Sequence, residues 1–198
     1  MVNIAIIKYN AGNIYSVVHG LRRIGIEPIV TDDKEAILAA DKVIFPGVGE
    51  ASSTMAYLRD QKLDRLILDL KQPVLGICIG LQLMCKHSEE GNVPCLGIFD
   101  TTVKRFISEN TTEKVPQMGW NTIQQLRTKL FTPEMENQYV YYVHSYYAAL
   151  CAQTIAVTDY LQPYSAALHK DNFYATQFHP EKSGDLGEQI LKNFIDFC

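Results

Sequence analysis

The chain has 198 residues, of which 47% are hydrophobic and 20% charged, and its formal net charge is −4. This composition is typical of a globular protein with one sizeable core, and we expect a single domain over residues 1–198. The acidic balance, the lack of a basic stripe and the lack of a long apolar run exclude nucleic acid and the membrane as main partners.

The N-terminal segment is apolar from Val2 to Ile7 and is too short and too uncharged for a signal peptide. We interpret it as a buried strand. None of the five cysteines forms a CxxC pair or a Cys/His cluster with zinc-ligand spacing, so we expect no metal and no cofactor. An odd number of cysteines without a secretion signal indicates the reducing cytoplasm.

The first half of the chain alternates between strand and helix patterns. Apolar runs predict strands at 2–7, 27–31, 42–45 and 74–77. Helical spacing of apolar residues predicts helices at 14–24, 34–39 and 51–70. The last of these is expected to break near Gln61, and Asn13 is expected to cap the first. This order implies a mostly parallel sheet with helices on both faces.

The second half of the chain has a different pattern. Short β-like runs occur at 102–106, 120–123, 139–143, 155–158, 166–169 and 173–177. We expect them to form antiparallel hairpins that are added to the sheet. A final amphipathic helix is predicted to begin at Ser183 or Gly184. The expected fold class is therefore α/β, with three α/β/α layers.

Cys78 is the most informative residue of the chain. An apolar strand pattern leads into it, a helical pattern follows it, and Gly76 and Gly80 flank it. Such glycines allow a sharp strand-to-helix turn that presents a nucleophile, and a helix N-terminus favours the reactive thiolate. A lone cysteine is more often inert packing, which is what we expect of Cys85, Cys95, Cys151 and Cys198. For Cys78 the context favours a nucleophile.

A cysteine nucleophile needs a base, and the base needs an orienting group. Three histidines, His19, His87 and His169, stand in segments that we expect to be exposed. His179 instead follows a strand pattern, and Glu181 comes two residues later. Spacing alone is equally compatible with a surface His–Glu pair. Together with the upstream cysteine turn, it favours a triad of Cys78, His179 and Glu181.

The segments Gly76-Ile77-Cys78-Ile79-Gly80-Leu81-Gln82 and His179-Pro180-Glu181 resemble those of the class I (triad) glutamine amidotransferases, and the resemblance extends over essentially the whole chain. It implies a flavodoxin-like fold and a glutaminase. Cys78 would attack the carboxamide of glutamine, His179 would act as general base and acid, and Glu181 would orient His179. The products would be a γ-glutamyl thioester and ammonia, and water would then release glutamate.

The same resemblance implies roles for the residues around the triad. The oxyanion hole would be formed by Gly47, Val48, Gly49 and the N–H of Ile79. The substrate glutamine would be held by Gln82, His144, Ser145 and Tyr146. Standing alone, Gly47 and Gly49 would indicate an ordinary strand-to-helix turn.

Five segments narrow the resemblance, at 10–13, 46–49, 116–121, 144–147 and 179–183. Together they resemble the family of glutaminase subunits of imidazole glycerol phosphate synthases, which belong to histidine biosynthesis. This implies a heterodimer with a separate (β/α)8-barrel cyclase subunit. In such a heterodimer, ammonia would reach the cyclase through a sheltered channel and be used to form imidazole glycerol phosphate and an aminoimidazole carboxamide ribotide.

Three residues are candidates for the interface with that partner, and each has a plainer interpretation. Asn13 could simply cap a helix, Trp120 could be core, and Lys182 could be a solvated charge. Two residues depart from the family pattern. Glu50 follows the oxyanion segment, where an aromatic or small-residue pattern is expected, and Gln117 stands where a histidine is common.

Two other functions remain open at this point. One is the glutaminase subunit of another synthase, such as the pyridoxal phosphate or anthranilate synthase component, against which the segment 116–121 argues. The other is a binding or regulatory module that kept the fold and lost turnover. The intact set of Cys78, His179 and Glu181 argues against this second alternative.

Overall fold

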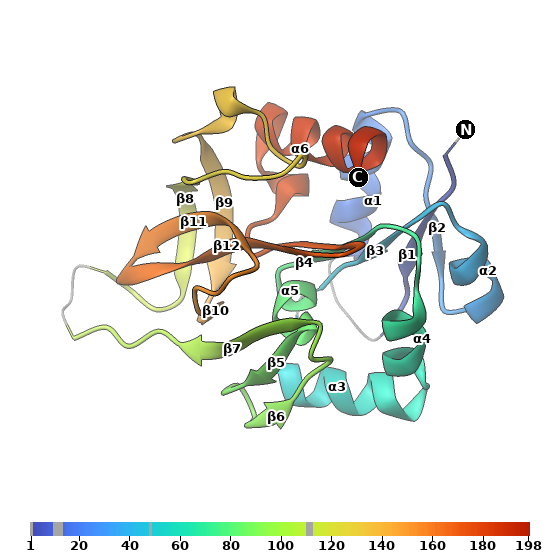
Figure 1. Cartoon of the computed structure of the whole chain (residues 1–198), viewed down its shortest axis with the longest axis horizontal. Helices are drawn as coiled ribbons and strands as arrows, with labels where there is room; N and C mark the ends of the chain where they lie inside the picture. Colours follow the sequence, from blue (N-terminus) through green and yellow to red (C-terminus); the bar gives the residue numbers. More distant parts are fainter. Residues whose placement is uncertain (1, 10–13, 48, 110–112) are drawn as a thin grey trace.

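The computed structural model describes residues 2–9, 14–47, 49–109 and 113–198. These residues form a central seven-stranded sheet in the order β11-β12-β13-β4-β3-β1-β2 (Figure 1). Its strands are β1 (Ile4–Ile7), β2 (Ile29–Thr31), β3 (Lys42–Phe45), β4 (Val74–Ile77), β11 (Thr154–Tyr160), β12 (Gln162–Lys170) and β13 (Phe173–Thr176). The first four strands lie in the order 2-1-3-4, which is typical of flavodoxin-like folds.

The central sheet is mostly parallel. β1 pairs in parallel with β2 and β3, and β4 pairs in parallel with β3 and β13. β11 and β12 form an antiparallel hairpin that extends the sheet beyond β13. All residues of β1, β3 and β4 are buried, as expected of parallel strands that are covered on both faces. The predicted parallel sheet with antiparallel additions is confirmed.

Helices cover both faces of the sheet and complete three α/β/α layers (Figure 1). α1 (Ile14–Arg23) and α6 (Gly184–Phe197) pack on one face, in a core that includes Ile6. The other face, whose core includes Ile7, is covered by α2 (Lys34–Ala39), α3 (Ala51–Asp60), α4 (Leu63–Asp69) and α5 (Ile79–Met84). Successive strand residues point to opposite faces, so Ile6 and Ile7 enter different cores. Within the described ranges, no helix has the length and apolar character that a membrane span requires.

The helical pattern over residues 51–70 consists of two helices. α3 ends at Asp60, and α4 begins at Leu63. Lys62 lies between them in the left-handed conformation, with φ of 56°, which an α-helix cannot continue through. The predicted break near Gln61 is confirmed, and so is the predicted start of the last helix at Gly184. The predicted helix cap Asn13 lies outside the described residues.

The expectation that all short strands of the second half join the central sheet as antiparallel hairpins is wrong. β8 (Gln117–Thr122) and β9 (Tyr139–His144) form a separate two-stranded sheet, and β13 joins the centre in parallel with β4. A further sheet contains β5 (Cys85–Ser88), β6 (Val93–Pro94), β7 (Phe99–Arg105) and β10 (Tyr146–Ala148). Two short 3-10 helices complete the described elements, η1 (Pro133–Met135) and η2 (Pro180–Lys182). Alternating hydrophobicity identifies a strand, but its partner is chosen by packing between distant segments.

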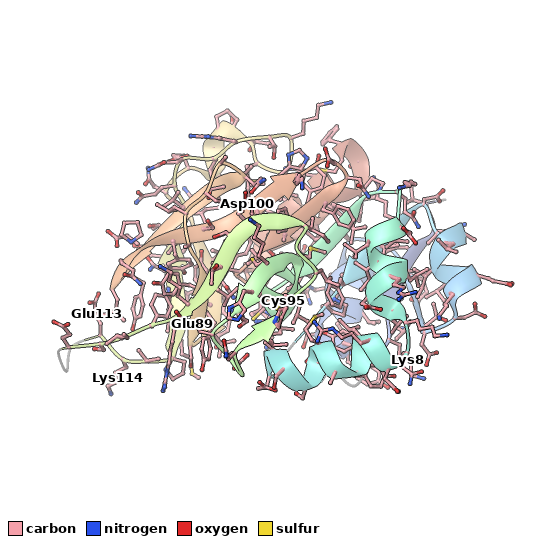
Figure 2. All side chains as sticks on the ribbon, turned by 60° about the horizontal axis from the view of Figure 1, so that its bottom comes forward. Lys8, Glu89, Cys95, Asp100, Glu113 and Lys114 are labelled. Atoms are coloured by element: carbon pink, nitrogen blue, oxygen red, sulfur yellow. The ribbon has the colours of Figure 1, made fainter. Side chains whose placement is uncertain are left out.

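The four-stranded sheet packs beside α3 and contains Cys85, one of the cysteines that we expect to be inert, and Cys95 directly follows β6. Lys86 and Asp100 form an ion pair between β5 and β7, and the backbone N–H of Arg105 donates to Glu89 over 2.8 Å. Figure 2 shows Glu89 and Asp100 near opposite ends of β7, with Cys95 between this sheet and α3. All four cysteines other than Cys78 pack in or against the two cores (Cys85, Cys95, Cys151 and Cys198). Burial raises the pKa of the Cys95 thiol to about 11, so this thiol remains protonated at neutral pH.

Candidate active site

Four chain segments meet where parallel strands of the central sheet end. Tyr9 follows β1, Gly47 follows β3, Cys78 follows β4, and His179 follows β13. The N–H of Cys78 donates to the carbonyl of Thr176 over 2.8 Å, which ties the ends of β4 and β13 together. Sites in α/β proteins lie at the carboxyl ends of parallel strands, so this edge is the expected place for one.

Cys78 occupies a strained backbone conformation at the start of α5. Its φ of 54° and ψ of −105° are unusual for a residue with a side chain, and such strain is found mostly at functional sites. The turn is possible because Gly80 lies against the neighbouring strand β3. A Cβ atom at Gly80 would be 2.2 Å from the carbonyl oxygen of Phe45. The predicted cysteine turn is therefore present in the structure.

His179 and Glu181 form a buried pair. The Nδ1 atom of His179 lies 2.8 Å from Oε1 of Glu181, and both side chains are 1% exposed. Because the carboxylate can only accept, Nδ1 donates to it, and Nε2 is the ring nitrogen left to exchange a proton with Cys78. Nε2 is buried and has no hydrogen-bond partner among the described residues. A buried, unpaired polar atom destabilises a fold by about 1–3 kcal/mol, which argues for a functional reason to keep it.

The charge state of His179 depends on its two neighbours in the predicted triad. Burial lowers its pKa, but the Cys78 sulfur and the Glu181 carboxylate outweigh burial and raise that pKa to about 10. The backbone also holds His179 in place, because its N–H donates to the carbonyl of Tyr141 over 2.9 Å. The structure thus brings the three predicted triad residues into one site, in which both neighbours favour a proton on His179.

A cavity of about 320 Å³ opens above the thiol of Cys78. The oxyanion candidates Gly49 and Ile79 line it. The four residues predicted to bind substrate line it as well: Gln82, His144, Ser145 and Tyr146. The cavity therefore brings Gly49 and the segment 143–146 next to the segment 78–82, which carries the thiol.

The segment after β3 requires glycine at Gly47. A Cβ atom there would lie 1.9 Å from Cγ2 of Ile79 and 2.3 Å from the hydroxyl oxygen of Tyr9. The Tyr9 hydroxyl also donates to the carbonyl of Pro46, so this segment is held where it enters the site. Val48, the central residue of the predicted oxyanion hole, lies outside the described residues.

The family model for class I glutamine amidotransferases matches residues 5–197. The chain belongs to this family. The chain is 62% identical over 193 residues to the imidazole glycerol phosphate synthase subunit HisH of Bacteroides fragilis (strain YCH46), with 98% of each chain covered. It is 44% identical over 195 residues to the HisH subunit of Pectobacterium atrosepticum, again with 98% of each chain covered. These identities place the amidotransferase among the HisH subunits.

Solved structures of lower identity share the fold of this amidotransferase. A putative GMP synthase protein from Thermoplasma acidophilum has a TM-score of 0.73 and 19% identity, with 98% of this chain and 93% of that chain covered. PurLQS from Thermotoga maritima has a TM-score of 0.70 and 14% identity, with 99% and 98% covered. The three-layer class I amidotransferase fold predicted from the sequence is confirmed.

The departure at Glu50 has a structural role in this amidotransferase. Its carboxylate caps α3 by accepting from the N–H groups of Ser52 over 3.0 Å and Ser53 over 2.8 Å. Desolvation opposes ionisation, but the hydrogen bonds from Ser53 and Ser52 lower the pKa of Glu50 to about 2. The N–H of Ala51, the first residue of α3, donates to the carboxylate of Glu90 over 2.9 Å. The residue that breaks the family pattern thus anchors the far end of the oxyanion segment.

Gln117, the other residue that departs from the family pattern, belongs to a buried hydrogen-bond network with Tyr164. The Tyr164 hydroxyl donates to Oε1 of Gln117 over 2.9 Å and lies 3.4 Å from Nε2 of His144. Nδ1 of His144 donates to the carbonyl of Tyr146 over 2.7 Å. Burial lowers the pKa of His144 to about 4, so its ring is neutral at pH 7. Nδ1 is therefore engaged by the backbone, and the His144 ring shapes the cavity wall.

The sequence interpretation missed three residues of the amidotransferase site. Gln177 is fully buried directly after β13, with Nε2 3.7 Å from Sγ of Cys78, and its position two residues before His179 is the available signal. Tyr9 approaches Gly47 from the end of β1. Glu90 lines the cavity but stands in a polar stretch that gave no indication of a site. His87 and His169, expected to be exposed, are partly buried and lie outside the cavity lining.

Proposed function

We propose that this amidotransferase is the glutaminase subunit of an imidazole glycerol phosphate synthase. It hydrolyses L-glutamine to glutamate and ammonia, and the ammonia passes to a cyclase subunit in histidine biosynthesis. The HisH relatives, up to 62% identical over 98% of the chain, support the pathway. The single structural observation that carries the chemistry is the buried His179–Glu181 pair beside the strained Cys78.

The reaction follows from the arrangement of these three residues. His179 takes the thiol proton at Nε2, and Sγ of Cys78 attacks the side-chain carbonyl carbon of glutamine. His179 then returns the proton to the departing nitrogen, which leaves ammonia and a γ-glutamyl thioester. Water, deprotonated by the same Nε2, attacks the thioester carbonyl; the C–S bond breaks, glutamate leaves, and the proton returns from Nε2 to Sγ of Cys78. Glu181 keeps the ring of His179 oriented and stabilises its positive charge throughout.

The negative oxygen of each tetrahedral intermediate needs preplaced donors. The N–H of Ile79, at the start of α5, and the backbone of the segment Gly47–Gly49 are the groups that we assign to this role. Gly49 and Ile79 line the cavity next to Cys78, which supports the assignment. The two anchored ends of the segment, at Tyr9 and Glu50, limit how far it can move.

The cavity also offers groups for the amino-acid end of glutamine. Both N–H groups of the Gln82 amide donate within the protein, to Tyr146 and Gln177, so Gln82 can offer substrate only its Oε1 acceptor. Glu90 adds a carboxylate to the lining. An ammonium group is the natural partner of two acceptors, one of them anionic. We therefore assign Gln82 and Glu90 to the α-ammonium group of glutamine.

The cyclase partner is expected to cover the outer face of the β8–β9 sheet. Trp120 on this face is 55% exposed, so the interpretation of Trp120 as core is wrong, and its ring packs edge-on against Tyr141. Met118 and Tyr139 on the same strands are also exposed. Lys182, on η2 beside the triad, is exposed as well. Exposed aromatic groups next to a catalytic site support an interface with the subunit that takes the ammonia. The cytoplasmic location and the barrel fold of the cyclase remain predictions, and Asn13 lies outside the described residues.

The test is to mix the purified protein with the ribotide substrate and its cognate cyclase, and to measure glutamate release. We expect glutamate and imidazole glycerol phosphate in equal amounts, and no glutamate from Cys78→Ala. Cys95→Ala is the matched control, because Cys95 packs away from the cavity, and it should retain full activity. Ammonium salts should bypass the Cys78→Ala defect, since they supply the product of the lost step. No glutamate from the unaltered complex, or full activity in Cys78→Ala, would refute the proposal.

A further inference from the structure

Gln177 lies between the substrate-binding amide Gln82 and the nucleophile Cys78. Its side chain is fully buried at the end of β13, and its backbone N–H donates to the carbonyl of Ala166 over 2.8 Å. Its amide lies 3.0 Å from Nε2 of Gln82 on one side and 3.7 Å from Sγ of Cys78 on the other. The triad of Cys78, His179 and Glu181 leaves this amide without an assigned role, although it contacts the sulfur.

The hydrogen-bond network determines which end of the Gln177 amide faces the sulfur. The carbonyl of Tyr146 can only accept, so the atom of Gln82 that lies 2.8 Å from it must be the donor Nε2. The same Nε2 faces Gln177, so Gln177 must present its acceptor, Oε1, in return. The remaining end of the amide, the donor Nε2, then points to Cys78.

Resting on the proposed function, we infer that Gln177 is a catalytic residue whose side-chain N–H donates to Sγ of Cys78 and stabilises the thiolate. An amide does not titrate near neutral pH, so it can stabilise the sulfur anion without competing with His179 for the proton. The bond becomes charge-assisted only when the proton has moved to His179, which makes it stronger in the reactive state than in the thiol state. It also holds the sulfur from a second side, in addition to the strained backbone of Cys78.

The alternative is that Gln177 only fills a polar site in the core. Both interpretations predict a loss of stability when the side chain is replaced. They differ in the behaviour of the sulfur. A donor to the thiolate lowers the pH at which Cys78 becomes reactive, whereas a merely structural amide leaves this pH unchanged. The decisive measurement is therefore the pH dependence of Cys78 alkylation.

The main variant is Gln177→Met, which keeps the length of the side chain and removes the donor. Alkylation of Cys78 by iodoacetamide is followed by mass spectrometry of the peptide that contains it, between pH 5 and pH 10. We expect the midpoint to rise by about one pH unit or more, and kcat for glutamate formation to fall about tenfold or more, while KM changes little. Asn193→Leu is the matched control. Asn193 lies in α6, and its buried side-chain amide donates to the carbonyl of Leu130 over 3.1 Å. Its replacement should change neither the alkylation midpoint of Cys78 nor kcat.

A midpoint and kcat within twofold of the unaltered protein in Gln177→Met would overturn the inference. A measurement on the unaltered protein covers the case in which the variant does not fold. The side-chain amide signals of Gln177 in NMR spectra should shift with the same midpoint as alkylation, and signals that stay constant through it would overturn the inference as well. Separate measurements test the proposed function and the role of Gln177. An unaltered complex that makes no glutamate refutes the function, whereas the alkylation midpoints decide the contact between Gln177 and the sulfur.

Discussion

Gly80→Ala tests the idea that the close approach of α5 to β3 positions the nucleophile. The added Cβ atom would lie 2.2 Å from the carbonyl oxygen of Phe45 and 3.3 Å from its carbonyl carbon. Both are backbone atoms of a buried central strand, so they cannot rotate away as the end of a flexible side chain would. The helix that begins at Ile79 has to move instead, and Cys78 moves with it.

The size of the effect follows from the overlap. Cβ atoms essentially never come closer than 3.0 Å to such neighbours, so α5 must move by about 0.8 Å, the difference between 3.0 Å and 2.2 Å. A misplacement of about 1 Å costs on the order of 10²-fold in rate. This loss corresponds to about 2.7 kcal/mol of barrier. Overpacking of a core destabilises a fold by about 1–3 kcal/mol, so we expect the variant to remain folded.

Two measurements on the complex with the cyclase decide the matter. Steady-state glutamate formation should show kcat reduced about 100-fold, and urea unfolding should show a loss of about 1–3 kcal/mol in the free energy of unfolding. Gly76→Ala provides a graded comparison. Its Cβ would meet Gly80 and the flexible end of Met84 at 3.0 Å, so its effect on kcat should be much smaller. Gly80→Ala with kcat within threefold of the unaltered enzyme would refute the reasoning.

Three further predictions follow from the site. Glu181→Gln removes the charge 2.8 Å from Nδ1 of His179, so the pKa of His179 should fall and kcat should drop about 10²- to 10⁴-fold, as pH–rate profiles would show; a drop below tenfold would contradict the triad. Glu50→Ala should lose about 1 kcal/mol of unfolding free energy at pH 7 through the lost helix cap, whereas Glu50→Gln, which keeps an acceptor oxygen, should lose less. Because the pKa of Glu50 is lowered from 4.5 to about 2, its stabilisation is complete above the higher value and is lost as the pH falls towards the lower one; urea unfolding that shows a constant difference from pH 7 to pH 2 would disprove this. Glu90→Gln should raise KM for glutamine about tenfold with little change in kcat, and an unchanged KM would remove Glu90 from the ammonium site.

Local signals in the sequence predicted much of the first half of the fold. The apolar run that leads into Cys78 forms β4 with the predicted bounds, and the break near Gln61 separates α3 from α4. These features depend on neighbours along the chain: burial of consecutive apolar residues, helical spacing, and the conformational freedom of glycine. The second half was predicted less well. Alternating patterns predict the strands, but the expectation that β8 and β9 join the central sheet is wrong, because pairing is decided by contacts between distant segments.

The amino-acid sequence alone is enough to identify Cys78, His179 and Glu181 as a candidate triad, since the strand-to-helix turn and the His–Glu spacing are local patterns. Only the tertiary structure places Gln177 against the sulfur and Glu90 in the cavity. Both contacts depend on the pairing of β4 with β13 and on the packing of the β5–β6 turn on α3. Hydrogen bonds and charges depend on distance and direction in space, and neither can be read from the order of residues along the chain.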